Sequence, residues 1–168
     1  MQENIFRSAI KSGLVLGALF TLRFVLSIVG SGWTVGLPRF AVMVIIIVAI
    51  WKLLERFRDN ENEGFISYGK SLGFTMLSFL YASILSAVVR IIYYISNPDV
   101  LGDAVNETLL ALDQMGMPIT EGTERMLEVM LSPAFLTFLT LLGNMIGGLI
   151  IGSIISAIVK KEKGVFEE

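Results

Sequence analysis

The chain has 168 residues, of which 54% are hydrophobic and 17% are charged, and its formal net charge is -2. Counting the 16 Gly in place of the 4 Tyr raises the apolar share to about 61%, against roughly 45 to 50% in soluble domains, which also carry roughly 25% charged residues. This composition excludes a soluble globule, a disordered chain and a nucleic-acid-binding protein, and it indicates an integral membrane protein.

The chain contains no Cys and no His. Their absence excludes thiolate nucleophiles, disulfides, Cys-ligated metals, His-based catalytic triads and His-ligated haem. The Ser and Thr residues of the apolar segments have no base beside them, and all carboxylates fall outside the predicted membrane core. We therefore expect no catalytic residue, no cofactor, no metal ligand and no proton-coupled transport.

Four apolar segments are long enough to cross a bilayer as helices, at about residues 8–30, 37–57, 69–96 and 133–159. Two of them contain long uncharged runs, 71–89 and 129–159, and a helix of about 20 residues spans a hydrocarbon layer of roughly 30 Å. The first segment includes Arg23, and the second continues past Lys52, whose aliphatic stem can reach the interface.

Residues that typically end or begin helices separate these segments. Residues 30–32, with the sequence Gly-Ser-Gly, should end the first helix, and Leu37 and Pro38 should begin the second. Ser132 and Pro133 fit the N-cap and first turn of the fourth.

The basic residues predict the orientation of the bundle. The N-terminus, the loop after the second span and the C-terminal tail together hold nine of them: Arg7, Lys11, Lys52, Arg56, Arg58, Lys70, Lys160, Lys161 and Lys163. The opposite side holds only Arg39 and Arg125. Because basic residues concentrate on the cytoplasmic side, both termini should be cytoplasmic. We read the first helix as a retained span and not as a signal peptide, since no small-residue cleavage site follows it.

Residues 97–132, here called the acidic segment, form the longest extramembrane piece. The segment holds seven carboxylates and one base, Arg125. Asn97 and Pro98 should end the third span and start a helix that Gly116 and Pro118 break. A second helix should begin near Thr120 and could continue into the fourth span. The apolar residues recur at helical spacing: Leu101, Ala104, Val105, Thr108, Leu109 and Leu112, then Met126, Leu127, Met130 and Leu131. We expect two amphipathic helices that cover the bundle, with a metal site or a partner surface as alternatives; no EF-hand spacing is present.

Small residues recur every fourth position in three of the spans: Gly13, Gly17, Gly69, Gly73, Gly143, Gly147, Gly148, Gly152 and Ser156. This spacing places them on one helix face, where another backbone can approach closely. Contact within the bundle explains them, and homodimerisation through the fourth span is the alternative, because that span carries two offset stripes. Asn144 is the only amide well inside a span, and we expect it to bond to a neighbouring helix.

Three arginines are predicted to converge on the outer half of the bundle: Arg23, Arg39 and Arg90. Arg23 stands about 18 Å along its helix from Lys11, and an arginine inside a membrane is a candidate functional residue. It can reach outward and pair with the acidic segment, or the three can form an anion or lipid-headgroup site, because guanidinium suits such groups.

Several motifs resemble a family of small membrane proteins known as domain of unknown function family 4199. They are the opening SAIKSGLVLGALF, the stretch FISYGKSLGF, the acidic middle, and an ending that runs from MLSPAF to GGLIIGSIISAIVKKE. The resemblance covers nearly the whole chain. It implies four transmembrane helices in a bacterial inner membrane, mainly in Bacteroidetes, and it supplies no activity and no functional residues.

The sequence therefore predicts an all-α fold, a single membrane domain over residues 1–168 that forms a four-helix bundle with short amphipathic helices between spans three and four. We expect a non-enzymatic protein that acts through helix-helix or protein-protein contact. Its predicted partners are the lipid bilayer and either a second copy or another membrane protein. The alternative is a small transport component that uses the three arginines.

Overall fold

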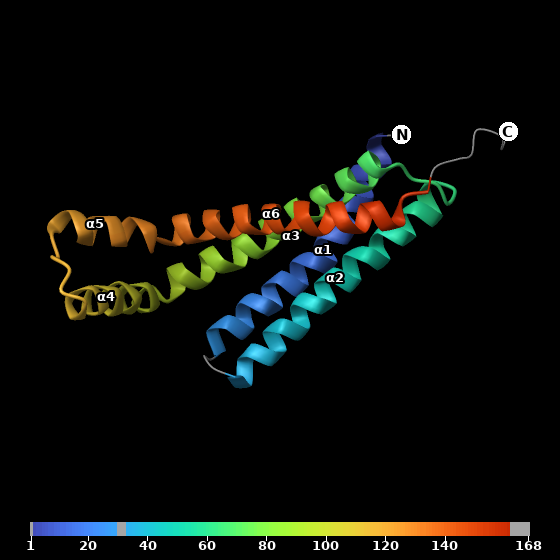
Figure 1. Ribbon diagram of the computed structural model, residues 1–168. Helices are drawn as coiled ribbons and strands as arrows, with labels where there is room; N and C mark the ends of the chain where they lie inside the picture. The colour runs from blue at the N-terminus through green and yellow to red at the C-terminus, as the bar shows by residue number, and fades with distance from the viewer. Residues whose placement is uncertain (1, 30–32, 162–168) are drawn as a thin grey trace. The chain divides into compact units, whose positions relative to one another are not determined.

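The computed structural model of the protein describes residues 2–29 and 33–161. Six helices follow one another in this part of the chain (Figure 1): α1 (Gln2–Val29), α2 (Trp33–Glu61), α3 (Tyr68–Ser96), α4 (Pro98–Gln114), α5 (Glu121–Met130) and α6 (Pro133–Val159). Four of them contain stretches long and apolar enough to cross a membrane: Ile5–Val29, Gly36–Glu61, Tyr68–Ser96 and Pro133–Val159. The predicted all-α membrane architecture is confirmed.

The helix bounds differ from the predicted spans mainly in the second helix. The third and fourth spans were predicted to within one residue. However, α2 begins at Trp33, so Leu37 and Pro38 do not open it, and Pro38 lies inside the helix. A proline so close to a helix start removes only one backbone hydrogen bond. The predicted break at residues 30–32 lies outside the described residues.

Side chains at the predicted helix starts behave in two ways. The Ser132 hydroxyl accepts a hydrogen bond from the Phe135 amide at 3.3 Å, which confirms it as the cap of α6. The Thr120 hydroxyl caps α5 in the same way through Thr123. The prediction that Asn97 caps α4 is wrong. Its side chain makes no cap bond to α4 and donates instead to the carbonyl of Tyr93 at 2.9 Å. It thereby satisfies an acceptor in the last turn of α3.

The last turns of α4 and α5 also set the bounds of the acidic segment. Gly116 follows α4 with a φ of 70°, a left-handed conformation that glycine adopts without strain. Two residues, Leu131 and Ser132, separate α5 from α6, so the second amphipathic helix does not continue into the fourth span.

Two compact units make up the fold. Unit 1 comprises Met1–Ser86 and Leu142–Glu168, and unit 2 comprises Ala87–Leu141. The hydrophobic core lies in unit 1 and takes buried side chains from α1, α2, α3 and α6. Within it, the Phe57 and Phe74 rings stack at 4.3 Å between centroids, and Phe20 meets Phe79 edge to face at 5.6 Å.

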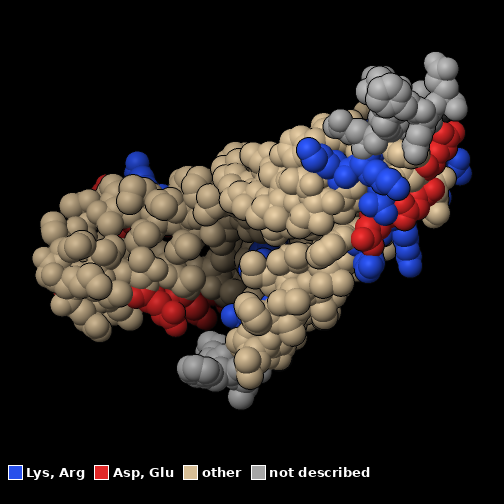
Figure 2. Space-filling view, turned by 45° about the vertical axis from the view of Figure 1, so that its right-hand side comes forward, with Lys and Arg blue, Asp and Glu red and all other residues tan. Residues whose placement is uncertain are grey.

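One end of unit 1 joins the start of α1, the end of α2, the start of α3 and the end of α6. Ile66, in the α2–α3 loop, exchanges two backbone hydrogen bonds with Lys161, at 2.8 and 3.0 Å. The Ser8 hydroxyl of α1 donates to Glu61 at the end of α2. Figure 2 shows Lys and Arg side chains gathered near this end, together with several carboxylates. The basic residues counted for orientation belong to these segments, except that Lys163 lies outside the described residues.

Candidate functional site

Gly13 and Gly17 bring the backbones of α1 and α3 together. A Cβ atom on Gly13 would lie 2.5 Å from the Cβ of Tyr81 and 3.2 Å from the carbonyl oxygen of Ser78. On Gly17 it would lie 2.7 Å from the Leu85 side chain and 3.3 Å from the carbonyl oxygen of Ala82. Both glycines therefore act in packing within the chain, as the four-residue spacing predicted.

The contact between α6 and α3 uses one of the two stripes on α6. A Cβ on Gly148 would meet the Phe79 ring at 2.7 Å, and one on Gly152 would meet the Thr75 methyl at 2.8 Å. Ser156, one turn further, is fully buried. This stripe faces α3, so within unit 1 it serves the bundle itself.

The other predicted small-residue pairs have open space around them. No described atom lies within 4 Å of a Cβ built on Gly69, Gly73, Gly143 or Gly147, beyond the helix's own backbone. The stripe Gly143–Gly147 on α6 is thus left without a packing neighbour among the described residues. Asn144 is half-buried beside it, and its amide forms no hydrogen bond to a described residue. Homodimerisation through this face stays a prediction.

Arg39 holds the end of α1 and does not stand alone as an anion-binding group. Its guanidinium donates to the carbonyl of Leu26 at 3.3 Å from two nitrogens and to that of Ser27 at 3.1 Å. The last carbonyls of a helix have no partner within the helix and carry partial negative charge. A cation from the start of α2 therefore satisfies carbonyl groups in the last turn of α1.

The other two predicted arginines belong to different units. Arg23 lies on α1 in unit 1 and is exposed, whereas Arg90 lies on α3 in unit 2 and is half-buried. The expected convergence of the three guanidinium groups stays a prediction, as does the anion or lipid-headgroup site that depends on it.

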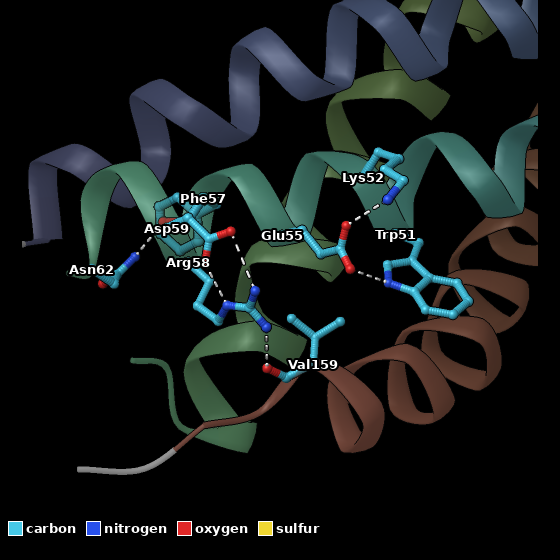
Figure 3. Close-up of polar contacts among 8 residues, drawn as sticks. All are labelled: Trp51, Lys52, Glu55, Phe57, Arg58, Asp59, Asn62 and Val159. Atoms are coloured by element: carbon cyan, nitrogen blue, oxygen red, sulfur yellow. Dashed lines mark hydrogen bonds and ion pairs between the residues drawn. The ribbon is translucent and has the colours of Figure 1, made fainter. Parts of the chain in front are cut away.

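A second arginine has a capping role that the sequence did not reveal. Arg58, near the end of α2, donates to the carbonyl of Val159 at 3.3 Å and pairs with Asp59 at 2.7 Å (Figure 3). It thus joins the last turn of α6 to α2. The partner lies 101 positions away, so no local sequence signal could have shown it. One turn before it in α2, Glu55 accepts from Lys52 at 2.8 Å and from the Trp51 ring nitrogen at 2.9 Å.

Some hydroxyl groups within the spans bond to their own helix, whereas five buried ones have no hydrogen-bond partner among the described residues: Ser71, Ser83, Ser86, Thr137 and Ser156. Thr75, Ser78, Thr140 and Ser153 each donate to the carbonyl four residues earlier, at 2.7 to 3.0 Å. These four hydroxyls satisfy their hydrogen-bonding capacity locally, on the backbone of the preceding turn. Within the described ranges, no three Asp or Glu side chains come together as a metal site would require.

Unit 2 contains an apolar groove between α4 and α5, here called the α4–α5 groove. The six α4 residues predicted to share a face are all half-buried, and every other residue of α4 is exposed. A cavity of about 530 Å³ is lined by Tyr94, Leu101, Val105, Leu131 and Pro133, with Glu128 at its edge. A second cavity of about 370 Å³ shares Asn106 with the first and reaches Asp113 and Ile119.

Neither helix of the groove has a buried residue. On α5 only part of the predicted apolar face turns inward: Leu127 and Leu131 are half-buried, but Met126 and Met130 are 57% and 44% exposed. Two amphipathic helices that bury so little of their apolar surface are incomplete by themselves, because such a face normally packs against another element.

A family model described as "Protein of unknown function (DUF4199)" matches residues 8–161. The chain belongs to this family. The match covers all four spans and the acidic segment, which confirms the family resemblance given by the sequence motifs. No curated protein and no solved structure matches the chain.

Proposed function

We propose that the protein is a non-enzymatic membrane protein that acts through protein-protein contact, and that the α4–α5 groove binds a basic amphipathic helix of a partner protein. The observation that carries this proposal is the groove itself: α4 and α5 have no buried residue. The apolar face of α4 lines open cavities of about 530 and 370 Å³, the first of which reaches α5 at Glu128. A third helix laid into the groove would bury these apolar faces, as in other helix-in-groove complexes.

Charge selects the partner. The acidic segment carries seven carboxylates against Arg125 alone, and two of them, Asp113 and Glu128, line the groove. A second copy would bring the same acidic surface and be repelled, and an anionic membrane surface would be repelled for the same reason. A helix with lysine or arginine beside its apolar face would cover the apolar groove and be attracted by its carboxylates.

The dimensions and the side chains suit such a partner. The 17 residues of α4 extend about 25 Å, so a helix of about 15 residues matches the groove. Four of the eight methionines of the chain lie in the acidic segment, at positions 115, 117, 126 and 130. Flexible thioether side chains adapt to the shape of an incoming helix.

Peptide binding to the full chain tests the proposal. The protein is reconstituted in nanodiscs of zwitterionic lipid and titrated with a fluorescent Leu/Lys amphipathic peptide or its Leu/Glu counterpart, with empty nanodiscs as background. We expect the Leu/Lys peptide to bind and the Leu/Glu peptide not to bind. Equal binding of the two peptides, or no binding above the empty nanodiscs, would contradict the proposal.

Two valines on α4 supply a matched pair of variants. Val105 lines the groove, whereas Val100 is 43% exposed and does not. Burial of a valine side chain contributes about 1.5 kcal/mol, so Val105→Gln should weaken peptide binding about tenfold. Val100→Gln should leave it unchanged. An equal loss in both variants would show that the groove is not the binding surface.

We further infer that the basic end of unit 1 faces the cytoplasm and that the acidic segment faces the opposite side of a bacterial inner membrane. The positive-inside rule supports this orientation. The natural chain has no Cys, so single cysteines can report it directly. Met115→Cys, at a site that is 71% exposed, should react with an impermeant maleimide on intact cells. Glu63→Cys, in the α2–α3 loop, should react only after permeabilisation, and the reverse pattern would overturn the orientation.

A further inference from the structure

A polar cavity lies at the basic end of unit 1, between the start of α1 and the end of α2. It has a volume of about 460 Å³ and is lined by Arg7, Ser8, Lys11, Asn60 and Glu61. A smaller cavity of about 150 Å³ shares four of these residues and adds Arg56. We call the two together the basic cavity. Its polar residues come from two helices that the bundle core holds in place.

Among the residues whose side chains the structure describes, no carboxylate pairs with the cations of the basic cavity. Arg7 and Lys11 are four residues apart and so lie on one face of α1, and Arg56 approaches from α2. None of the three takes part in the ion pairs seen at this end of α2, Lys52–Glu55 and Arg58–Asp59. Glu61 is the single carboxylate among the described lining residues and accepts a hydrogen bond from the Ser8 hydroxyl. These lining residues together carry a net charge of about +2, counting one unit for each ionised side chain.

The floor of the basic cavity is apolar. Leu53, Phe57 and Phe74 line its smaller part, and the two phenylalanine rings stack on each other at 4.3 Å. A site with cations at its mouth and aliphatic and aromatic side chains at its base fits an amphiphile with an anionic head. A small inorganic anion would have no use for the apolar base.

The depth of the cavity agrees with the headgroup layer. The apolar part of α1, Ile5–Val29, has 25 residues and extends about 37 Å, which exceeds a hydrocarbon layer of roughly 30 Å. About 3.5 Å of α1 at each end therefore stands among headgroups, a length that includes Arg7. Lys11 lies one turn further along α1, and its flexible aliphatic stem can extend the ammonium group to the same level. Basic pockets between membrane helices bind anionic headgroups at this level.

We propose that the basic cavity binds the phosphate group of an anionic phospholipid. Arg7, Lys11 and Arg56 supply the charge, the Asn60 amide supplies a further hydrogen-bond donor, and the floor receives the first carbons of an acyl chain. The site differs from the one predicted at Arg23, Arg39 and Arg90, and it does not depend on the α4–α5 groove.

Native mass spectrometry of the full chain tests this assignment. The protein is taken from nanodiscs of phosphatidylcholine mixed with phosphatidylglycerol, and the fraction that retains each lipid is measured. The wild type should retain one phosphatidylglycerol in preference to phosphatidylcholine. Lys11→Gln and Arg56→Gln should each lower this fraction several-fold, whereas Glu61→Gln should raise it, because it removes the one negative charge of the cavity.

Lys160→Gln is the matched control, since Lys160 is an exposed lysine at the same end of the bundle that does not line the cavity. It should leave the fraction unchanged. Equal retention of the two lipids, an equal effect of Lys160→Gln and Lys11→Gln, or no rise with Glu61→Gln would each overturn the assignment. Added glycerol phosphate or inorganic phosphate distinguishes the source of the anion: the lipid should stay bound, and displacement at equal concentration would assign the cavity to a free phosphate. Circular dichroism and gel filtration establish that each variant is folded.

Discussion

Gly13→Ala should loosen the contact between α1 and α3. The added Cβ would lie 2.5 Å from the Cβ of Tyr81, and this atom is fixed to the backbone of α3, so no side-chain rotation can relieve the contact. Ordinary van der Waals contact begins at 3.4 Å. The two helices must therefore separate by about 0.9 Å, a displacement that forfeits a quarter to a half of the dispersion attraction at the contact.

The magnitude follows from two opposing terms. Overpacking of a close contact costs about 1 to 3 kcal/mol. Replacement of glycine by alanine in a helix gains up to about 1 kcal/mol of helix propensity. Gly73→Ala is the matched control, because Gly73 is a helical glycine of α3 with no described atom within 4 Å of its Cβ. It should show the favourable term alone, so the two variants should differ by about 1 to 3 kcal/mol in the free energy of unfolding.

Reversible unfolding in mixed detergent micelles measures this difference. We expect Gly73→Ala to be at least as stable as the wild type and Gly13→Ala to be the least stable of the three. If both alanine variants shift the free energy of unfolding by the same amount in the same direction, the close approach of α1 and α3 does not exist as described, and the reasoning fails.

Three further variants test other parts of the structure. If the open stripe of α6 forms a homodimer, replacing both Gly143 and Gly147 by Ile should weaken self-association at least tenfold, or about 1.4 kcal/mol. An unchanged oligomer mass in mild detergent would contradict the homodimer. Arg58→Gln should remove the hydrogen bond to Val159, cost about 1 kcal/mol, and speed hydrogen exchange in the last turn of α6; unaltered exchange would contradict the capping role. Because Arg23 is exposed, Arg23→Leu should change the free energy of unfolding by no more than about 0.5 kcal/mol; a larger loss would show a structural role, and loss of a copurifying anionic lipid would favour a transport component.

Several features of the fold follow from local sequence alone. The uncharged runs place α3 and α6 to within a residue because the cost of a charge in hydrocarbon confines each span. Ser132 caps α6 as predicted, and Gly116 ends the first amphipathic helix, because both act through atoms one turn away. The start of α2 was placed four residues too late, since Pro38 resembles a first-turn residue but is tolerated further inside. Asn97 follows the end of α3 as predicted, but its side chain serves the last turn of α3 and does not cap α4, because its amide can serve either neighbour.

The candidate sites depended on long-range contacts. The sequence shows which glycines could pack closely but not which have a neighbour, so it could not separate Gly148 and Gly152, which meet α3, from Gly143 and Gly147, which have open space. The same holds for the basic cavity, which joins the start of α1 to the end of α2 across about fifty positions of sequence.

The sequence by itself determined that the protein lies in a lipid bilayer, how many spans it has and where the amphipathic helices of the acidic segment lie. Each of these rests on hydrophobicity and charge within about 30 residues, which is the length over which a bilayer selects a helix. Only the tertiary structure decided which glycine stripe α6 uses, which carbonyls Arg39 and Arg58 satisfy, and where cavities remain. These features depend on the fit between side chains from distant segments, because helices in a membrane associate through close packing and polar contacts that periodicity alone does not specify.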